Sequence, residues 1–128
     1  MSLAQLFSLG RVSQVFKIKD VQFKLVLLDT RVLSQALEAA NVVTDEVAQA
    51  LQYKKQILAR ALTEIDGEVY IKNEDDPDAE DVLQVNKILN KLHISIINGL
   101  YAKYEKLDQT VTKEVNDDLK NSSKNPGA

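Results

Sequence analysis

Hydrophobic and polar residues alternate between positions 12 and 28 of the chain. Apolar side chains occupy every second position in two short runs that flank Lys19-Asp20. Because successive side chains of a strand point to opposite faces, each run predicts a strand with one apolar face. A turn at Lys19-Asp20 would place Phe16 opposite Phe23 and both apolar sets on one side of the sheet. This agreement predicts a β-hairpin over residues 12–28, while the absence of Gly from the turn keeps a longer loop as the alternative.

A helical period replaces this alternation between residues 30 and 66, where apolar side chains recur at steps of three and four. Residues able to cap a helix precede each of two such stretches, which predicts helices over 30–41 and 44–66. Asp66-Gly67 would end the second helix, because glycine readily takes the left-handed conformation found after a helix. Residues 69–71 then predict a short third strand against the hairpin. The candidate capping residues are Asp29, Thr30 and Thr44.

The longest apolar stripe follows and predicts a helix over residues 78–120. Two arrangements fit it. A break at the turn signal Asn98-Gly99 would give two helices, near 78–97 and 100–120. An unbroken helix would instead reach far beyond the body of so small a domain, and its second half would have to bury its apolar residues against another chain.

The two ends of the chain differ from the part between them. Residues 1–10 place apolar side chains at helical spacing up to Gly10, too few for a helix that is stable alone, so they must lie on their own domain or in a partner's groove. Residues 121–128 are polar and predict a tail. We therefore expect a docking segment over 1–10 and a single α+β domain over 11–120. That domain is mostly helical, with an N-terminal β-hairpin packed on a helical bundle that ends in a long helix.

The residue inventory narrows the possible functions. The chain has 128 residues, no Cys, one His and a formal net charge of −3. These counts exclude a disulfide scaffold, a thiolate metal site and a metal site with several histidine ligands. No phosphate-binding glycine loop or nucleophile motif occurs, so we expect no enzyme, no cofactor and no metal. The acidic balance argues against nucleic acid as a partner, and no apolar run approaches the roughly 18 residues that a membrane-spanning helix needs.

Six acidic residues crowd into positions 74–81. A calcium loop starting at Asp76 would need Gly at its sixth position and Glu at its twelfth, where this chain has Asp81 and Lys87. We therefore interpret the segment as the start of the next helix, with Asp76 as the cap and Pro77 as the first helical residue. Acidic side chains in a first turn also interact favourably with the helix dipole.

Several stretches together resemble small tail proteins of tailed phages, in particular the T-even-type baseplate or baseplate-hub-assembly family and related tail assembly chaperones. The likeness spans roughly residues 10–108 and includes the pattern Leu-Tyr-x-x-Tyr-x-x-Leu at 100–107. The resemblance implies structural or assembly work through protein contacts and has no catalytic residue to transfer. The stretches that carry it are Gly10-Arg11-Val12, Phe16-Lys17-Ile18, Val21-Gln22-Phe23-Lys24-Leu25, Ile57 to Gly67, and Ile96 to Leu107.

We therefore expect a non-enzymatic phage tail or baseplate protein, or a chaperone for one, whose partners are other tail or baseplate proteins. Its location would be the host cytoplasm during assembly, with retention in the virion tail as an open alternative. The rival hypothesis is a free-standing helical adaptor or regulatory module that forms a homodimer through its C-terminal helix. The expected partner-binding residues are Leu3, Leu6, Phe7, Tyr101, Tyr104, Leu107 and Val111.

Overall fold

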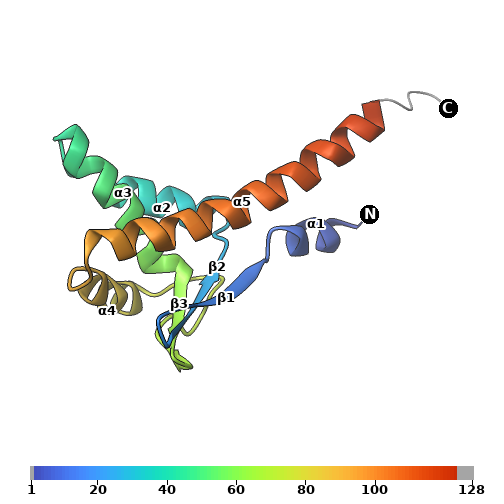
Figure 1. The fold of residues 1–128 in the computed structure, drawn as a ribbon. Helices are drawn as coiled ribbons and strands as arrows, with labels where there is room; N and C mark the ends of the chain where they lie inside the picture. The colour runs from blue at the N-terminus through green and yellow to red at the C-terminus, as the bar shows by residue number, and fades with distance from the viewer. Residues whose placement is uncertain (1, 124–128) are drawn as a thin grey trace.

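A small antiparallel sheet lies at one end of the molecule, and helices pack against one of its faces (Figure 1). This is the mostly helical α+β fold that the sequence predicts. The computed structural model describes residues 2–123. Its sheet has four strands in the order β1-β2-β3-β4. In chain order the elements are α1 (Leu3–Leu9), β1 (Ser13–Ile18), β2 (Val21–Val26), α2 (Thr30–Ala40), α3 (Glu46–Ala61), β3 (Leu62–Ile65), β4 (Glu68–Val69), α4 (Ala79–Leu89) and α5 (Ile94–Ser123).

The predicted hairpin is present with the predicted register. Strands β1 and β2 are antiparallel and place Phe16 opposite Phe23, whose ring centroids lie 5.9 Å apart. The connection is a two-residue turn in which Lys19 takes the left-handed backbone conformation, with φ of 56°. Lys19 thus takes the place of the expected glycine. Glycine would adopt this left-handed conformation with less strain, because a side chain is tolerated but disfavoured there.

The predicted helix over 44–66 is wrong in its last five residues, of which 62–65 form strand β3 and Asp66 lies in the turn that follows. The chain passes from helix to strand at Leu62, whose N–H donates to the carbonyl of Leu58 and whose backbone is already extended. Asp66 and Gly67 both have positive φ, 52° and 79°, which is the signature of a hairpin turn rather than of a helix end. The turn joins β3 to β4. The strand predicted at 69–71 against the hairpin is therefore shorter, spanning Glu68–Val69, and it pairs with β3 instead.

The helix predicted over 78–120 is two helices, and the break is not at Asn98-Gly99. Helix α4 ends at Leu89 and α5 begins at Ile94, so Gly99 lies inside α5. The break between the two helices contains no glycine. The His93 side chain marks the start of α5, where its Nδ1 accepts a hydrogen bond from the N–H of Ser95 at 3.0 Å. The helix then continues to Ser123, three residues into the predicted tail, and residues 124–128 lie outside the described residues.

Aspartates cap three of the helices, as expected from their ability to accept hydrogen bonds from free N–H groups of the first turn. Asp29 caps α2 as predicted, through the N–H of Val32. The caps of the next two helices lie further along the chain than predicted: Asp45 rather than Thr44 caps α3, and Asp78 rather than Asp76 caps α4. Pro77 therefore precedes the cap instead of opening the helix.

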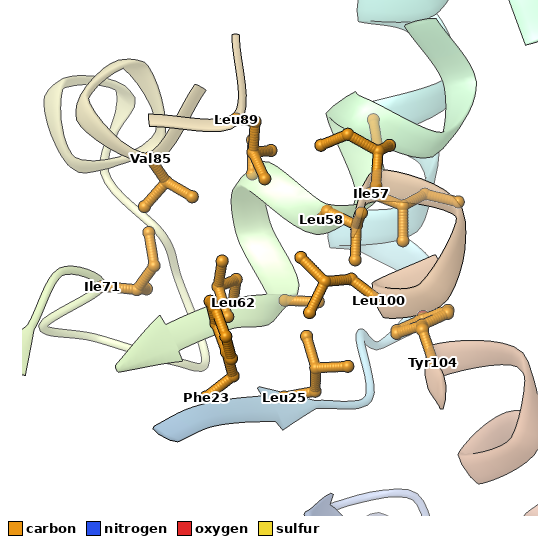
Figure 2. Close-up of a cluster of buried hydrophobic side chains, with 14 of the residues drawn as sticks. Phe23, Leu25, Ile57, Leu58, Leu62, Ile71, Val85, Leu89, Leu100 and Tyr104 are labelled. Carbon is orange, nitrogen blue, oxygen red and sulfur yellow. The ribbon is translucent and has the colours of Figure 1, made fainter. Parts of the chain in front are cut away.

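The core surrounds the last turns of α3, where side chains from the sheet, α4 and α5 meet (Figure 2). Helix α3 contacts α2, α4 and α5 as well as strands β2 and β3. Leu58 and Leu62 are completely buried, and Leu25 of β2 and Leu100 of α5 lie against them. The other large side chains that Figure 2 labels in this cluster are Phe23, Ile57, Ile71, Val85, Leu89 and Tyr104.

Two glycine substitutions test this account of the turns. We expect Gly67→Ala to lower the free energy of unfolding by about 1 kcal/mol, because alanine disfavours the left-handed backbone of the β3–β4 turn. Gly99→Ala should instead raise it by about 0.5–1 kcal/mol, since Gly99 is helical and a Cβ there meets no atom within 4 Å. Urea unfolding of both variants checks this, and a Gly99→Ala variant less stable than wild type would contradict a continuous α5.

Candidate functional site

Helix α1 is formed by local interactions and has no buried residue. Ser2 and Gln5 make a capping box, in which the Ser2 N–H donates to Oε1 of Gln5 at 2.6 Å and Oγ of Ser2 accepts from the N–H of Gln5 at 3.2 Å. Three large apolar side chains on the helix are exposed by 64%, 54% and 62%, namely Leu3, Leu6 and Phe7. Residues 2–10 contain no charged side chain. The segment thus offers an uncharged apolar face that its own domain leaves uncovered.

The second half of α5 extends away from the body of the molecule and passes near α1 (Figure 1). A groove of about 720 Å³ lies between the two helices, with Leu6 and Leu9 on the α1 side and Val115 and Leu119 on the α5 side. Leu119 is 62% exposed, whereas Val115 is half-buried. The α1–α5 groove, as we call this site, is therefore open, and its lining combines these four apolar side chains with three polar residues of α5, Asp118, Asn121 and Ser122.

The four residues predicted on α5 divide into two groups. Tyr104 and Leu107 are buried in the core, with 6% and 9% of their surface exposed, and the N–H of Leu28 donates to the Tyr104 hydroxyl at 3.4 Å. Tyr101 and Val111 are half-buried. In this conformation Tyr104 and Leu107 hold the fold together, and their own chain covers most of their surface. The other predicted partner-binding residues retain accessible surface, namely Leu3, Leu6, Phe7, Tyr101 and Val111.

Of the apolar residues that line the groove, the predicted partner-binding set contains Leu6 but not Leu9, Val115 and Leu119. Val115 lies on the apolar stripe that predicts the helix over 78–120, four residues after Val111, and Leu119 continues the same four-residue step. That step is the signal that could have found Leu119. The body of the domain ends before these residues are reached, which explains why the same stripe is buried at Leu107 and exposed at Leu119.

The acidic segment after β4 pairs with basic side chains from three other parts of the chain. Glu74 lies 3.5 Å from Nζ of Lys24 on β2, Asp75 lies 3.7 Å from Arg11, and Asp76 lies 3.2 Å from Arg31 on α2. The ion pair from Lys24 to Glu64 is the shortest on the sheet side, at 3.2 Å, and this hydrogen bond raises the pKa of Lys24. The acidic segment thus partly covers the sheet at Lys24.

These pairs connect the segment before β1, the sheet and α2 at the surface. The Arg11 and Arg31 pairs are more than half exposed, so each contributes little to the free energy of folding. Asp78 in the same run serves as the cap of α4. Asp81 accepts a hydrogen bond from the N–H of Lys72 at 3.3 Å, so five of the six acidic residues over 74–81 have structural partners within the chain.

Comparison of the chain with known protein families, with curated proteins and with solved structures finds no match. Within residues 2–123, no helix is both long enough and apolar enough to cross a membrane.

Two leucine substitutions on α5 distinguish the core from the open surface. We expect Leu107→Ala to lower the free energy of unfolding by about 2–4 kcal/mol, because it leaves a cavity beside buried neighbours. Leu119→Ala should change it by less than about 0.5 kcal/mol, since its side chain makes few contacts within the chain. Chemical denaturation of the two variants gives both values, and equal losses would show that α5 packs on its own chain over its whole length.

Proposed function

We propose that this chain is a non-enzymatic assembly protein that works through protein–protein contacts made by α1 and by the end of α5. The single observation that carries the proposal is the exposure of the apolar side chains on α1, together with the open α1–α5 groove. Monomeric proteins rarely leave neighbouring large apolar side chains uncovered, and such patches usually mark a binding surface.

Helix α1 has the properties of a segment that docks into a partner's groove. An isolated helix of its length, seven residues, is unstable in water, so its stability must come from what its apolar face contacts. Side chains at steps of three and four, such as Leu3, Leu6 and Phe7, are the anchors used when an amphipathic helix enters an apolar groove. The contact would gain about 25 cal/mol for each Å² of apolar surface removed from water.

The resemblance to phage tail proteins suggests which assembly this is. We propose a baseplate or tail component, or a chaperone for one, that meets other tail proteins in the host cytoplasm. The motif Leu-Tyr-x-x-Tyr-x-x-Leu supports this only indirectly, because its Tyr104 and Leu107 are core residues. We therefore assign the partner contacts of this proposal to helical surfaces outside residues 10–108, which carry the resemblance. These surfaces are α1 and the part of α5 beyond residue 108.

The rival function, a homodimeric adaptor, is favoured by the length of α5. A helix of 30 residues is about 45 Å long at 1.5 Å per residue, and its second half projects from the domain (Figure 1). Val111, Val115 and Leu119 recur on it at four-residue steps. Two such helices packed together would cover these side chains without any other protein.

The first proposal is tested by replacing Leu3, Leu6 and Phe7 together with Ser. We expect unchanged thermal stability, because all three side chains are exposed, but loss of tail assembly in cells that express the tail genes around this gene. Electron microscopy counts the tails, and mass spectrometry of purified particles shows whether the protein stays in them. Leu83→Ser, at an exposed leucine on α4, is the control and should assemble normally. A gene far from any tail genes, or normal assembly by the triple variant, would refute the proposal.

Light scattering tests the rival function. A homodimeric adaptor should have twice the mass of the chain, and Val115→Glu with Leu119→Glu should return it to a monomer, because the added charges would be buried at the interface. Leu83→Glu should leave the mass unchanged. A wild-type monomer at micromolar concentration would exclude this function.

A further inference from the structure

Three of the four tyrosines of the chain meet between α3 and α5. The ring of Tyr101 lies edge-on to that of Tyr53, with centroids 6.1 Å apart, and is stacked on that of Tyr104 at 6.3 Å. They line a pocket of about 220 Å³ together with Leu33, Ile57, Glu105, Asp108 and Gln109. We call this the tyrosine pocket. No residue of α1 or of the α1–α5 groove lines it, so it is a separate surface.

The pocket is preformed and its edge is acidic. Tyr104 is buried and held by the Leu28 N–H, so one wall is fixed by the core. Glu105 and Asp108 are exposed, and neither has a basic partner within 4.0 Å among residues 2–123. Burial raises the pKa of Tyr101, with smaller effects from Tyr53 and from the negative charge of Glu105. The Tyr101 hydroxyl is therefore harder to ionise, and its ring lies beside two carboxyl groups that have no ion-pair partner within residues 2–123.

A cation already lies against one of these rings. Nζ of Lys54 is 5.7 Å from the centroid of Tyr101 and donates a hydrogen bond to Oδ1 of Asn98 at 3.0 Å. Electron-rich ring faces attract cations, and the attraction is stronger where water is partly excluded. Lys54 does not line the pocket itself, so the carboxylates at the pocket's edge are left without a counter-charge.

We propose that the tyrosine pocket binds the side chain of an arginine from a protein partner. A guanidinium group is planar, so it can stack on a tyrosine ring while its N–H groups donate to a carboxylate in a bidentate arrangement. The chain's own arginines do not fill this role. Arg11 and Arg31 pair with Asp75 and Asp76, and Arg60 donates to Gln56. The guest must then come from another molecule.

The test titrates the full chain with N-acetyl-arginine amide and follows the tyrosine ring signals by NMR. We expect saturable shifts of Tyr53, Tyr101 and Tyr104 with millimolar affinity, and none for Tyr70, which lies outside the pocket. N-acetyl-citrulline amide has the same shape without the charge and should produce no shifts. Replacing Glu105 with Gln and Asp108 with Asn should weaken binding about tenfold, the loss expected from a charge-assisted hydrogen bond.

Glu114→Gln with Asp117→Asn is the matched control, because it removes the same charge from the same helix outside both the tyrosine pocket and the α1–α5 groove. It should leave the affinity unchanged, and an equal loss would show that only the overall charge matters. Shifts with citrulline, absence of saturation, or tighter binding of spermidine than of the arginine probe would overturn the proposal. The measurement needs no partner protein, so its failure is distinct from a failure of the tail-assembly proposal.

Discussion

The end of helix α3 is buried on every side that its apolar residues face, and the other elements are arranged by that burial. Between Ile57 and Leu62 only Arg60 keeps partial contact with solvent. Its guanidinium group donates to the carbonyl and to the side chain of Gln56. Helices α2, α4 and α5 and strand β2 each supply neighbours to this stretch. The chain enters strand β3 at Leu62 directly after α3, with no loop between them, and this joins the sheet to the helices.

The sequence predicts the elements whose period is unambiguous and fails where a local signal competes with a distant contact. The β1–β2 hairpin follows from alternation alone. Residues 62–65 continue the helical step of α3, and only pairing of Leu62 with Leu25 and of Ile65 with Phe23 turns them into a strand. Asn98-Gly99 is a strong turn signal, yet Ile97 and Leu100 on either side are buried in the core, and this packing holds the helix through the glycine.

Prediction from the sequence is also limited at the candidate site. The spacing of apolar residues predicts which face of α5 is apolar. It does not predict where along the helix the rest of the domain stops covering that face. Tyr104 and Leu107 satisfied every local criterion for a partner-binding surface and are core residues. Helix α1 was predictable because its apolar residues recur at helical spacing and Gly10 separates it from the sheet, although contacts of its apolar face must supply its stability.

A single rigid helix relates the two surfaces that we assign to partners. Asp108 at the tyrosine pocket and Leu119 at the α1–α5 groove are 11 residues apart on α5, or about 16 Å along its axis. A partner that contacts both would bind the second site at a high effective concentration once the first is occupied. The two sites would also differ in what they discriminate, because burial of apolar surface is non-directional, whereas a stacked and hydrogen-bonded guanidinium requires one orientation. The groove would then supply much of the affinity and the pocket would fix the register of the partner along α5.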